Sequence, residues 1–457
     1  MWFHTAAHTA LTLSVLSAVT LAAPVEEVKR ATPPLPSADS FYSVPENIAS
    51  YAPGAIINHR SPPSSIAAFG IDPVNLEATY QISYRTTDNL GNATSTVLTV
   101  MVPENADMTK VLSYQVAEDA ASLDCAPSYA MQLADATGPL LGTIVTQAEI
   151  LLIVAALYQG WVVIMPDHEG PQGAYLANRL AGYATLDGIR AALQSTSITG
   201  IQSDARVGMW GYSGGSLASM WAAALQPSYA PELASQLVGA AVGGTVPNIH
   251  NVINTVNEGP FAGLIAAGIM GLSHVYPLIA EVVKTQFSNQ DKFEAVLHQC
   301  LVPDIADFLL ADVKGMAANQ SLWTEPAITE ILDYNSLESF SAPSSNFPFY
   351  LYKSVLDEAS PIADTDALVD AYCSAGVSIE YTRDLVSEHG SLAVIGAPKA
   401  LVWLKDRMNG QAASSGCSTN TVISSLLDIA TIEVLPTFLL DALSALLGGE
   451  VGPTFFG

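Results

Sequence analysis

The segment Gly211-Tyr212-Ser213-Gly214-Gly215 is the part of the sequence that most directly indicates chemistry. It follows a short apolar run, Arg206 to Trp210, and opens a stretch of small residues, Gly214 to Leu225, that is typical of a helix. A Gly-x-Ser-x-Gly turn between a strand and a helix holds its serine in a strained conformation, with Oγ exposed above the sheet. Ser213 is therefore the candidate nucleophile. The alternative is a glycine turn in which the serine only caps a helix.

A serine hydroxyl becomes an effective nucleophile when a histidine accepts its proton and a carboxylate holds that histidine in the required tautomer. In hydrolases with such a serine turn, the chain order is nucleophile, acid, histidine. Of the eight histidines, only His389 fits, since it follows a strand-like run, Val377 to Thr382, and precedes a Gly-Ser turn. The others lie in the N-terminal leader, before the serine, or in a helical insertion: His4, His8, His59, His168, His250, His274 and His298. An exposed loop histidine without a role is the alternative for His389.

The candidate acid is Asp357, which follows the apolar run Phe347 to Tyr352 and precedes a helical segment, Asp364 to Ser374. A loop after a late strand is where hydrolases of this order carry the acid. The competitors lie close in sequence: Glu358, Asp364 and Asp366.

A tetrahedral intermediate needs two hydrogen-bond donors for its oxyanion. One comes from the residue after the nucleophile, here Gly214, and the other from a loop after an early strand. The run Val111 to Val116 leads into Ala117-Glu118-Asp119-Ala120, so the backbone N–H of Asp119 is the second candidate. A helix cap is the alternative role for Asp119.

Strand-like and helix-like segments alternate along the chain, which predicts an α/β fold with a mostly parallel sheet flanked by helices. Helical periodicity marks Leu140 to Tyr158 and Tyr175 to Leu193. The strand-like runs are Thr96 to Val102, Val111 to Val116, Trp161 to Met165, Arg206 to Trp210, Leu237 to Val242, Phe347 to Tyr352 and Val377 to Thr382.

The segment from about Thr245 to about Ser341 breaks this alternation and predicts an inserted helical subdomain. Its apolar run between Glu258 and Glu281 contains a serine, a histidine and a proline, so a buried or lid helix is favoured over a membrane span. The apolar segment Val434 to Leu447 is too short to span a bilayer and contains Asp441. We therefore expect no transmembrane span.

The net charge of the chain limits the kinds of partner that it is expected to bind. The chain has 457 residues, of which 43 are acidic and 16 basic, giving a formal net charge of −27. Such a surface disfavours nucleic acid and anionic membranes. No Cys-x-x-Cys or His-Glu-x-x-His spacing occurs, so the sequence predicts neither a metal site nor a cofactor.

The N-terminus is typical of a secretion signal, with an apolar run from Ala10 to Ala18 followed by small residues. We assign residues 1–22 to a signal peptide and 23–30, which end in Lys29-Arg30, to a candidate propeptide, so that the mature domain covers 31–457. Two glycosylation sequons, at Asn92 and Asn319, fit the same secreted, extracellular route.

Four cysteines in a secreted chain predict two disulfides, for which three pairings exist. Their order along the chain favours Cys125 with Cys300 and Cys373 with Cys417. Free buried thiols are the alternative.

Longer motifs surround these residues, and together they resemble the fungal secretory lipases of the yeast lipase A type over most of the mature chain. The motifs are Ser113-Tyr114-Gln115, Glu118-Asp119-Ala120, Leu123-Asp124-Cys125-Ala126-Pro127-Ser128-Tyr129, Asp167-His168-Glu169-Gly170, Leu186-Asp187-Gly188-Ile189-Arg190, the serine turn, Tyr229-Ala230-Pro231-Glu232-Leu233 and Gly259-Pro260-Phe261-Ala262-Gly263. The resemblance implies an α/β-hydrolase fold, a Ser213, Asp357 and His389 triad, and an oxyanion hole from the amides of Gly214 and Asp119.

The resemblance also implies that residues of about 245–341 form a helical lid and that two disulfides are present. Asp357-Glu358 match the acid motif of the family, whereas Ala359-Ser360-Pro361-Ile362 depart from it at the rim of the acid loop. The lid and the C-terminal flap, which govern acyl-chain choice in the family, match least well.

The function that follows is a secreted carboxylic-ester hydrolase, a triacylglycerol lipase that works through an acyl-enzyme at an oil–water interface, as a monomer and without a cofactor. One alternative is an esterase for soluble short-chain or acetyl esters. A peptidase and a non-catalytic secreted binding protein are further alternatives, because the fold alone does not fix the substrate.

Overall fold

The structure is a computed structural model that describes residues 32–70, 72–132 and 149–428. The signal peptide and propeptide assigned to residues 1–30, part of the helix expected from Leu140, and the apolar segment from Val434 lie outside the described residues.

Within these described ranges, a ten-stranded sheet forms the centre of the fold, with the strand order β1-β4-β5-β7-β6-β8-β9-β10-β11-β12. Every neighbouring pair from β7 to β12 is parallel, whereas the pairs among β1, β4, β5 and β7 are antiparallel. The strands are β1 (Ile56–Arg60), β4 (Ala78–Thr87), β5 (Ala93–Val102), β6 (Asp107–Gln115), β7 (Trp161–Pro166), β8 (Arg206–Tyr212), β9 (Leu237–Gly243), β10 (Phe349–Ser354), β11 (Ile379–Asp384) and β12 (Cys417–Val422). A separate two-stranded sheet joins β2 (Ala67–Ala68) to β3 (Asp72–Pro73).

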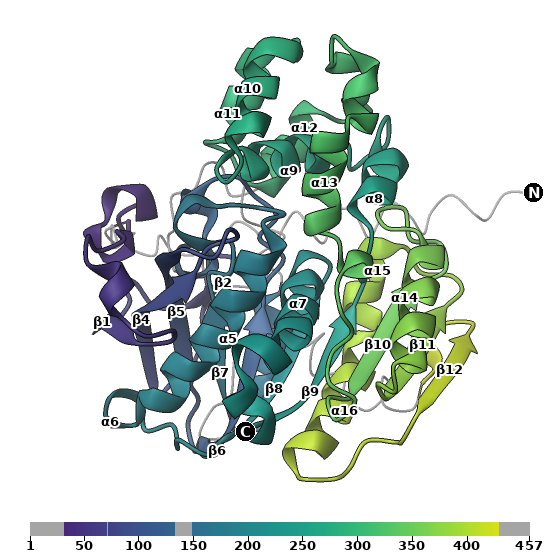
Figure 1. Cartoon of the computed structure of the whole chain (residues 1–457). Coiled ribbons are helices and arrows are strands. Elements are labelled where there is room, and N and C mark those ends of the chain that lie inside the picture. The colour runs from purple at the N-terminus through teal and green to yellow at the C-terminus, as the bar shows by residue number, and fades with distance from the viewer. Residues whose placement is uncertain (1–31, 71, 133–148, 429–457) are drawn as a thin grey trace, which may run out of the picture. The chain divides into compact units, whose positions relative to one another are not determined.

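Helices cover both faces of the sheet, as expected for parallel strands that are buried on both sides (Figure 1). They are α2 (Pro127–Ala130), α4 (Ile150–Leu157), α5 (Asn178–Gln194), α6 (Thr196–Thr199), α7 (Gly214–Tyr229), α14 (Ile362–Ser374), α15 (His389–Ile395) and α16 (Ala397–Met408). The predicted α/β fold with a mostly parallel sheet is confirmed.

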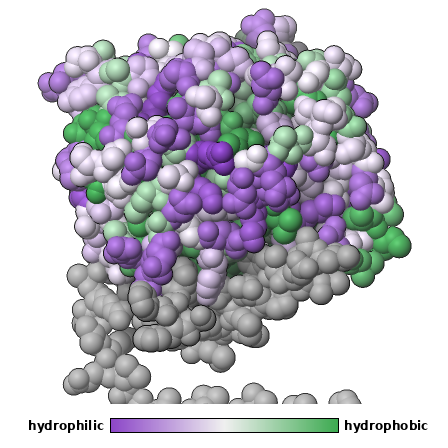
Figure 2. Space-filling view, turned by 90° about the horizontal axis from the view of Figure 1, so that it is seen from below, coloured by the Kyte–Doolittle hydropathy of each residue, from purple (hydrophilic) through white to green (hydrophobic). Residues whose placement is uncertain are grey.

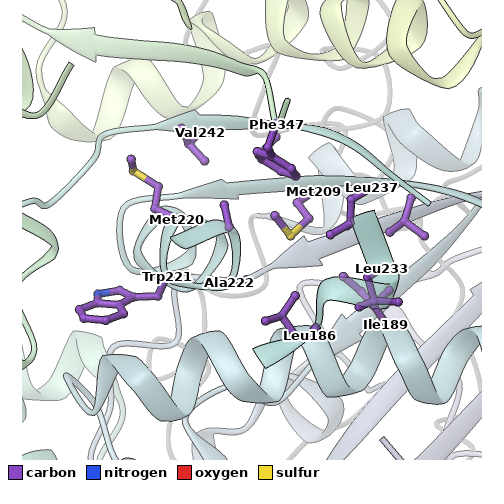
Figure 3. Packing of buried hydrophobic residues seen from close by; sticks show 14 of the residues in the cluster. Leu186, Ile189, Met209, Met220, Trp221, Ala222, Leu233, Leu237, Val242 and Phe347 are labelled. Carbon is purple, nitrogen blue, oxygen red and sulfur yellow. The ribbon is translucent and has the colours of Figure 1, made fainter. Parts of the chain in front are cut away.

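The two faces of the sheet carry separate apolar cores, because successive side chains of a strand point to opposite sides. On β8, Met209 belongs to the core that α5 and α7 cover, and Figure 3 shows it in one cluster with Leu186 of α5 and Ala222 of α7. The next residue, Trp210, belongs to the core that α4 and α16 cover. β8 is therefore packed on both of its faces, and it ends at the serine turn.

Six α-helices lie between β9 and β10 in the chain, within the segment predicted to be a helical insertion. They gather at one end of the sheet in Figure 1 and share an apolar core of their own. They are α8 (Ile249–Val256), α9 (Gly263–Ser273), α10 (Pro277–Gln286), α11 (Gln290–Val296), α12 (Leu301–Asp307) and α13 (Pro326–Tyr334).

The apolar run between Glu258 and Glu281 forms α9 and the start of α10, separated by a break before Pro277. Within the described ranges, no helix is both long and apolar enough to cross a membrane. The face seen in Figure 2, at the end of the sheet away from α8–α13, carries mainly hydrophilic residues with apolar ones scattered among them.

Candidate active site

Ser213 lies at the sharp turn between β8 and α7, with a backbone φ of 51° and ψ of −119°. This conformation is costly for a residue with a side chain, and the surrounding structure has to impose it. The turn closes so tightly that a Cβ at Gly211 would lie 2.2 Å from the carbonyl oxygen of Gly215. A Cβ at Gly215 would lie 2.0 Å from the carbonyl oxygen of Gln115. Both glycines are therefore required for the turn that presents Ser213.

Three residues far apart in sequence come together at this turn. Nε2 of His389 lies 2.8 Å from Oγ of Ser213, and Nδ1 of the same ring lies 2.8 Å from Oδ2 of Asp357. The backbone N–H of His389 donates to Oε2 of Glu358, and its carbonyl oxygen accepts a hydrogen bond from the Tyr212 hydroxyl. The imidazole is thus held at both ring nitrogens and through its backbone.

Asp357 lies in the loop after β10 and is held by four donors. Oδ1 accepts from the backbone N–H groups of Ala359 and Ser360, at 3.0 and 2.7 Å. Oδ2 accepts from His389 and from the ammonium of Lys353, each at 2.8 Å. Burial alone would raise the pKa of Asp357, but the His389 hydrogen bond and the Lys353 charge hold it well below its usual value. The carboxyl is therefore ionised at any pH at which the protein is expected to work.

The three competitors for the acid role have other partners. Glu358 binds the backbone of His389, and Asp364 accepts a hydrogen bond from Asn251 of α8. Asp366 binds Tyr381 and Arg383. Of the four acidic residues, only Asp357 contacts the imidazole ring.

The loop after β6 lies beside the serine turn, as expected, but its hydrogen bonds differ from the expectation. The N–H of Asp119 donates to Oε1 of Glu169 at 3.1 Å, so this amide already has an acceptor within the protein. Oδ1 of Asp119 is buried and has no hydrogen-bond partner among the described residues. It lies 1.9 Å from the position that a Cβ on Gly214 would take. The side chain of Asp119, rather than its amide, is thus the free polar group over Gly214.

Buried carboxyl groups surround this loop, a feature that the sequence analysis missed. Burial raises the pKa of Asp119 to about 7, although the electrostatic interaction with His389 opposes the shift. Burial raises the pKa of Glu149 to about 8 and that of Asp167 to about 7, against the hydrogen bonds that each carboxyl accepts. Glu118 and Glu169 have pKa values well above normal because of burial and neighbouring carboxyls. We call Glu118, Asp119, Glu149, Asp167 and Glu169 the acid cluster.

The helical insertion contains an apolar pocket. Its walls come from α8, α9 and α13 and include Val252, Ile253, Ile265, Gly268 and Ile328. Tyr175 and Leu176 line this pocket and also a smaller one that reaches Gly214 and Leu217 on α7. The ring of Phe261, before α9, lies 6.5 Å from the imidazole of His389. Tyr175 and Leu176 therefore form a shared wall between the pocket of the insertion and the smaller pocket beside the serine turn.

The remaining predicted residues have clear positions. Disulfides join Cys125 to Cys300 and Cys373 to Cys417, the pairing that the order along the chain favours. The first links the loop next to the oxyanion region with the insertion across 175 residues of sequence. The side chains at both sequons, Asn92 and Asn319, are exposed. Within the part of the chain that the structure describes, no group of three or more ligating side chains could hold a metal ion.

The sheet order, the strained serine at the end of β8 and the adjoining histidine define an α/β-hydrolase. The family model of the secretory lipases matches residues 136–416 of the chain. Lipase A of Arthroderma benhamiae is 46% identical over 99% of this chain and 97% of its own length. Lipase 5 of Candida albicans is 40% identical over 84% of this chain and 83% of its own.

Among solved structures, Candida antarctica lipase A in its closed state is similar, with a TM-score of 0.78 and 29% identity. That match covers 93% of this chain and all of the other. The rice cell wall degrading esterase LipA from Xanthomonas oryzae, at 16% identity and a TM-score of 0.58, shares the fold alone. The chain belongs to the secretory lipase family, and it is a serine ester hydrolase of the lipase class. The prediction of a lipase with an α/β-hydrolase fold is confirmed.

Proposed function

We propose that the protein hydrolyses lipid esters with Ser213 as nucleophile, His389 as general base and acid, and Asp357 as the residue that orients the imidazole. The unbroken line of hydrogen bonds from Ser213 Oγ through His389 to Asp357 is the observation that carries the proposal. Asp357 fixes the proton on Nδ1, so that Nε2 is free to take the proton of Ser213.

The reaction has two stages. Oγ of Ser213 attacks the ester carbonyl while His389 takes its proton, and the tetrahedral intermediate expels the alcohol, which receives that proton from His389. The acyl group remains on Ser213. A water molecule, deprotonated by His389, then attacks the acyl-enzyme, and the fatty acid leaves as the proton returns to Ser213.

The oxyanion of each intermediate requires donors that are in place beforehand. Gly214 is the first residue of α7, so its N–H lies outside the hydrogen bonds of the helix. We assign the second donor to the carboxyl of Asp119 in its protonated form, because its amide is bound to Glu169. Its pKa of about 7 favours the protonated form in acid and leaves about half of it at neutral pH.

The insertion between β9 and β10 is proposed to act as the lid that covers the acyl chain. Its apolar pocket shares the wall residues Tyr175 and Leu176 with the small pocket at Gly214, and the ring of Phe261 lies 6.5 Å from the imidazole of His389. A long acyl chain would bury its methylene groups there, each contributing about 0.8 kcal/mol. Opening of the lid at an oil–water interface would then admit the substrate.

The proposal also covers secretion, processing and oligomeric state. The family is one of secretory lipases, and the two disulfides are typical of an oxidising compartment. We propose removal of a signal peptide of residues 1–22, cleavage after Lys29-Arg30, glycosylation at Asn92 and Asn319, and action as a monomer.

The test compares hydrolysis of an emulsified long-chain triglyceride with that of a dissolved short-chain ester, with Ser213→Ala as the blank. Strong turnover of the emulsion is expected, together with covalent labelling of the native protein, but not of Ser213→Ala, by a fluorophosphonate probe. Activity confined to the dissolved ester would replace the interfacial lipase with a soluble esterase. Undiminished activity or labelling of Ser213→Ala would overturn the assignment of the nucleophile.

A further inference from the structure

Lys353 is a fully buried lysine directly beside the proposed catalytic acid. It lies on β10 and its side chain is 0% exposed. Its ammonium lies 2.8 Å from Oδ2 of Asp357, four residues later, and donates to the carbonyl oxygen of Thr245 at 2.8 Å. The oxygen that Lys353 contacts is the same one that binds Nδ1 of His389.

Burying an ammonium group has a large desolvation penalty, so the position of Lys353 needs an explanation. Burial lowers the pKa of Lys353, and the negative charge of Asp357 opposes that shift. Ion pairs removed from water regain their desolvation cost only in part, and an apolar residue at such a strand position often leaves a protein as stable or more stable. Stability alone is therefore a poor reason for a lysine at this position.

We propose that Lys353 is a positioning residue that fixes Oδ2 of Asp357 and counterbalances its charge, so that His389 stays neutral and able to accept a proton in acid. The inference rests on the proposed function. An ionised carboxylate on Nδ1 favours the imidazolium form of a histidine. When an ammonium shares that oxygen, the carboxylate attracts a second positive charge less strongly. His389 then remains a base at lower pH than it would with Asp357 alone.

The other charged groups around this site are mainly acidic, which makes the lysine more important. Glu358 binds the backbone of His389, Asp119 faces the imidazole, and Asp364 lies near Lys353. Tyr212 packs against the imidazole with a pKa that burial and nearby carboxylates raise well above normal, so it stays neutral. Each of these carboxylates, when ionised, would favour the imidazolium form, and Lys353 opposes them from the oxygen that the ring itself contacts.

Lys353 also donates a hydrogen bond to the carbonyl oxygen of Thr245, and the effect of losing this bond has to be distinguished from the effect of losing the positive charge. Thr245 follows β9 at the start of the helical insertion, and the preceding Gly244 packs against Tyr212 and His389. Lys353→Gln removes the charge but keeps a side-chain donor, whereas Lys353→Met removes both. A charge effect must therefore appear in both variants.

The experiment measures kcat/KM on a dissolved ester between about pH 4 and about pH 9 for the native protein and both variants. We expect the acid limb of the profile to move up by about one pH unit in each variant, which is about a tenfold loss at acidic pH. Above the acid limb, including the range in which Asp119 loses its proton, kcat/KM of each variant stays within about threefold of native at the same pH, because the triad itself is intact there. Lys399→Met, which breaks the surface pair with Asp428, is the matched control and should leave the profile unchanged.

Two results would overturn the inference: an acid limb that does not move in Lys353→Gln, or an equal loss at every pH, which marks a purely structural role. If Lys353→Met does not fold, as judged by its melting temperature, Lys353→Gln decides alone. Failure of the proposed function would be seen separately, as persistent activity of Ser213→Ala. An inactive Ser213→Ala with an unshifted Lys353→Gln would reject only the role of Lys353.

Discussion

The backbone N–H of Asp119 donates to Oε1 of Glu169, a buried carboxyl that also binds the N–H of Ala120. The loop beside the serine is therefore anchored through the amide that was expected to face the substrate. The group over Gly214 without a partner among the described residues is the Asp119 carboxyl. A substitution of the Asp119 side chain, which would leave a backbone donor in place, therefore tests the oxyanion hole directly.

Removal of the Asp119 side chain should therefore slow catalysis. Asp119 has a φ of 48°, so glycine is the substitution that removes the carboxyl without backbone strain. Loss of one oxyanion donor costs about 10²- to 10³-fold in kcat, which we expect for Asp119→Gly. Asp119→Asn keeps a donor in place and tolerates the same φ, so it should stay within about tenfold of native.

Steady-state kinetics on a dissolved ester compare the two Asp119 variants. Near-native kcat in Asp119→Gly would mean that the backbone amide is released from Glu169 during turnover and suffices as the donor.

Asp357→Asn should lower kcat by about 10⁴-fold, because an amide stabilises the wrong tautomer of the imidazole. The matched control is Asp364→Asn, which alters an aspartate that binds Asn251 and does not touch the ring. It should keep nearly full activity. Rates of single turnovers for both variants provide the measurement, and comparable losses in the two would contradict the choice of Asp357.

That Ser213, Asp357 and His389 meet was predictable from sequence, because each follows a recognisable strand and their order along the chain leaves one histidine. The strands β8, β10 and β11 are short apolar runs, and their ends carry Ser213, Asp357 and the loop to His389. The antiparallel strands β1 and β4 were not identified, since β1 is partly exposed and β4 mixes polar and apolar residues.

The acid cluster and Lys353 could not be predicted for a different reason. A lone Glu or Lys in the sequence is ordinarily a solvated surface residue. Only the pairing of strands shows that Lys353 of β10 lies between β9 and β11, and only the fold brings Glu149 to the loop after β6. The clue in the sequence was that Lys353 directly follows the apolar run Phe347 to Tyr352, four residues before Asp357.

Partial filling of the apolar pocket should shorten the acyl chain that the protein prefers. Val252 lines this pocket from α8 and is only partly buried, so a larger side chain there can be accommodated without disrupting a core. Val252→Phe should reduce kcat/KM for a long-chain ester by about tenfold relative to a short-chain ester, since a few methylene groups lose their contacts. The ratio of the two rates is the measurement. Val44→Phe, in a surface groove elsewhere, is the control, and an unchanged ratio in Val252→Phe would place the acyl chain outside this pocket.

The disulfide between Cys125 and Cys300 should stabilise the contact between the oxyanion loop and the insertion. It closes a long stretch of chain, and such a bond typically contributes about 2–4 kcal/mol through the unfolded state. The double variant Cys125→Ala and Cys300→Ala should therefore melt at a lower temperature than native. A melting curve measured beside the corresponding Cys373 and Cys417 double variant tests this, and an unchanged temperature would assign the stability to packing alone.

The acid cluster should make the protein most stable in acid. The folded-state pKa of Glu149, about 8, lies above its ordinary value, so the folded protein keeps a proton that the unfolded chain releases. This contribution is fully present below the unfolded-state pKa, about 4.3, and is lost as the pH rises through about 8. Asp119 and Asp167, with pKa values of about 7, act in the same direction. Asp357 has the opposite sign, because its lowered pKa stabilises the fold above its unfolded value and is lost only in stronger acid.

The melting temperature should therefore fall as the pH rises from about 5 to about 8, and Glu149→Gln should weaken that fall. The side-chain amide introduced by this substitution keeps an oxygen that can accept from the N–H of Ala117, which Glu149 binds at 2.8 Å, but it carries no proton to lose. At about pH 8 the variant should melt a few degrees above native, while at about pH 5 the two should nearly coincide. Glu232→Gln, at an exposed glutamate that pairs with Arg190, is the control for a general effect of lost charge. If the melting temperatures of native protein and Glu149→Gln changed in parallel across this range, Glu149 would be ionised in the folded state. Only a group that binds or releases a proton on unfolding makes the melting temperature depend on pH.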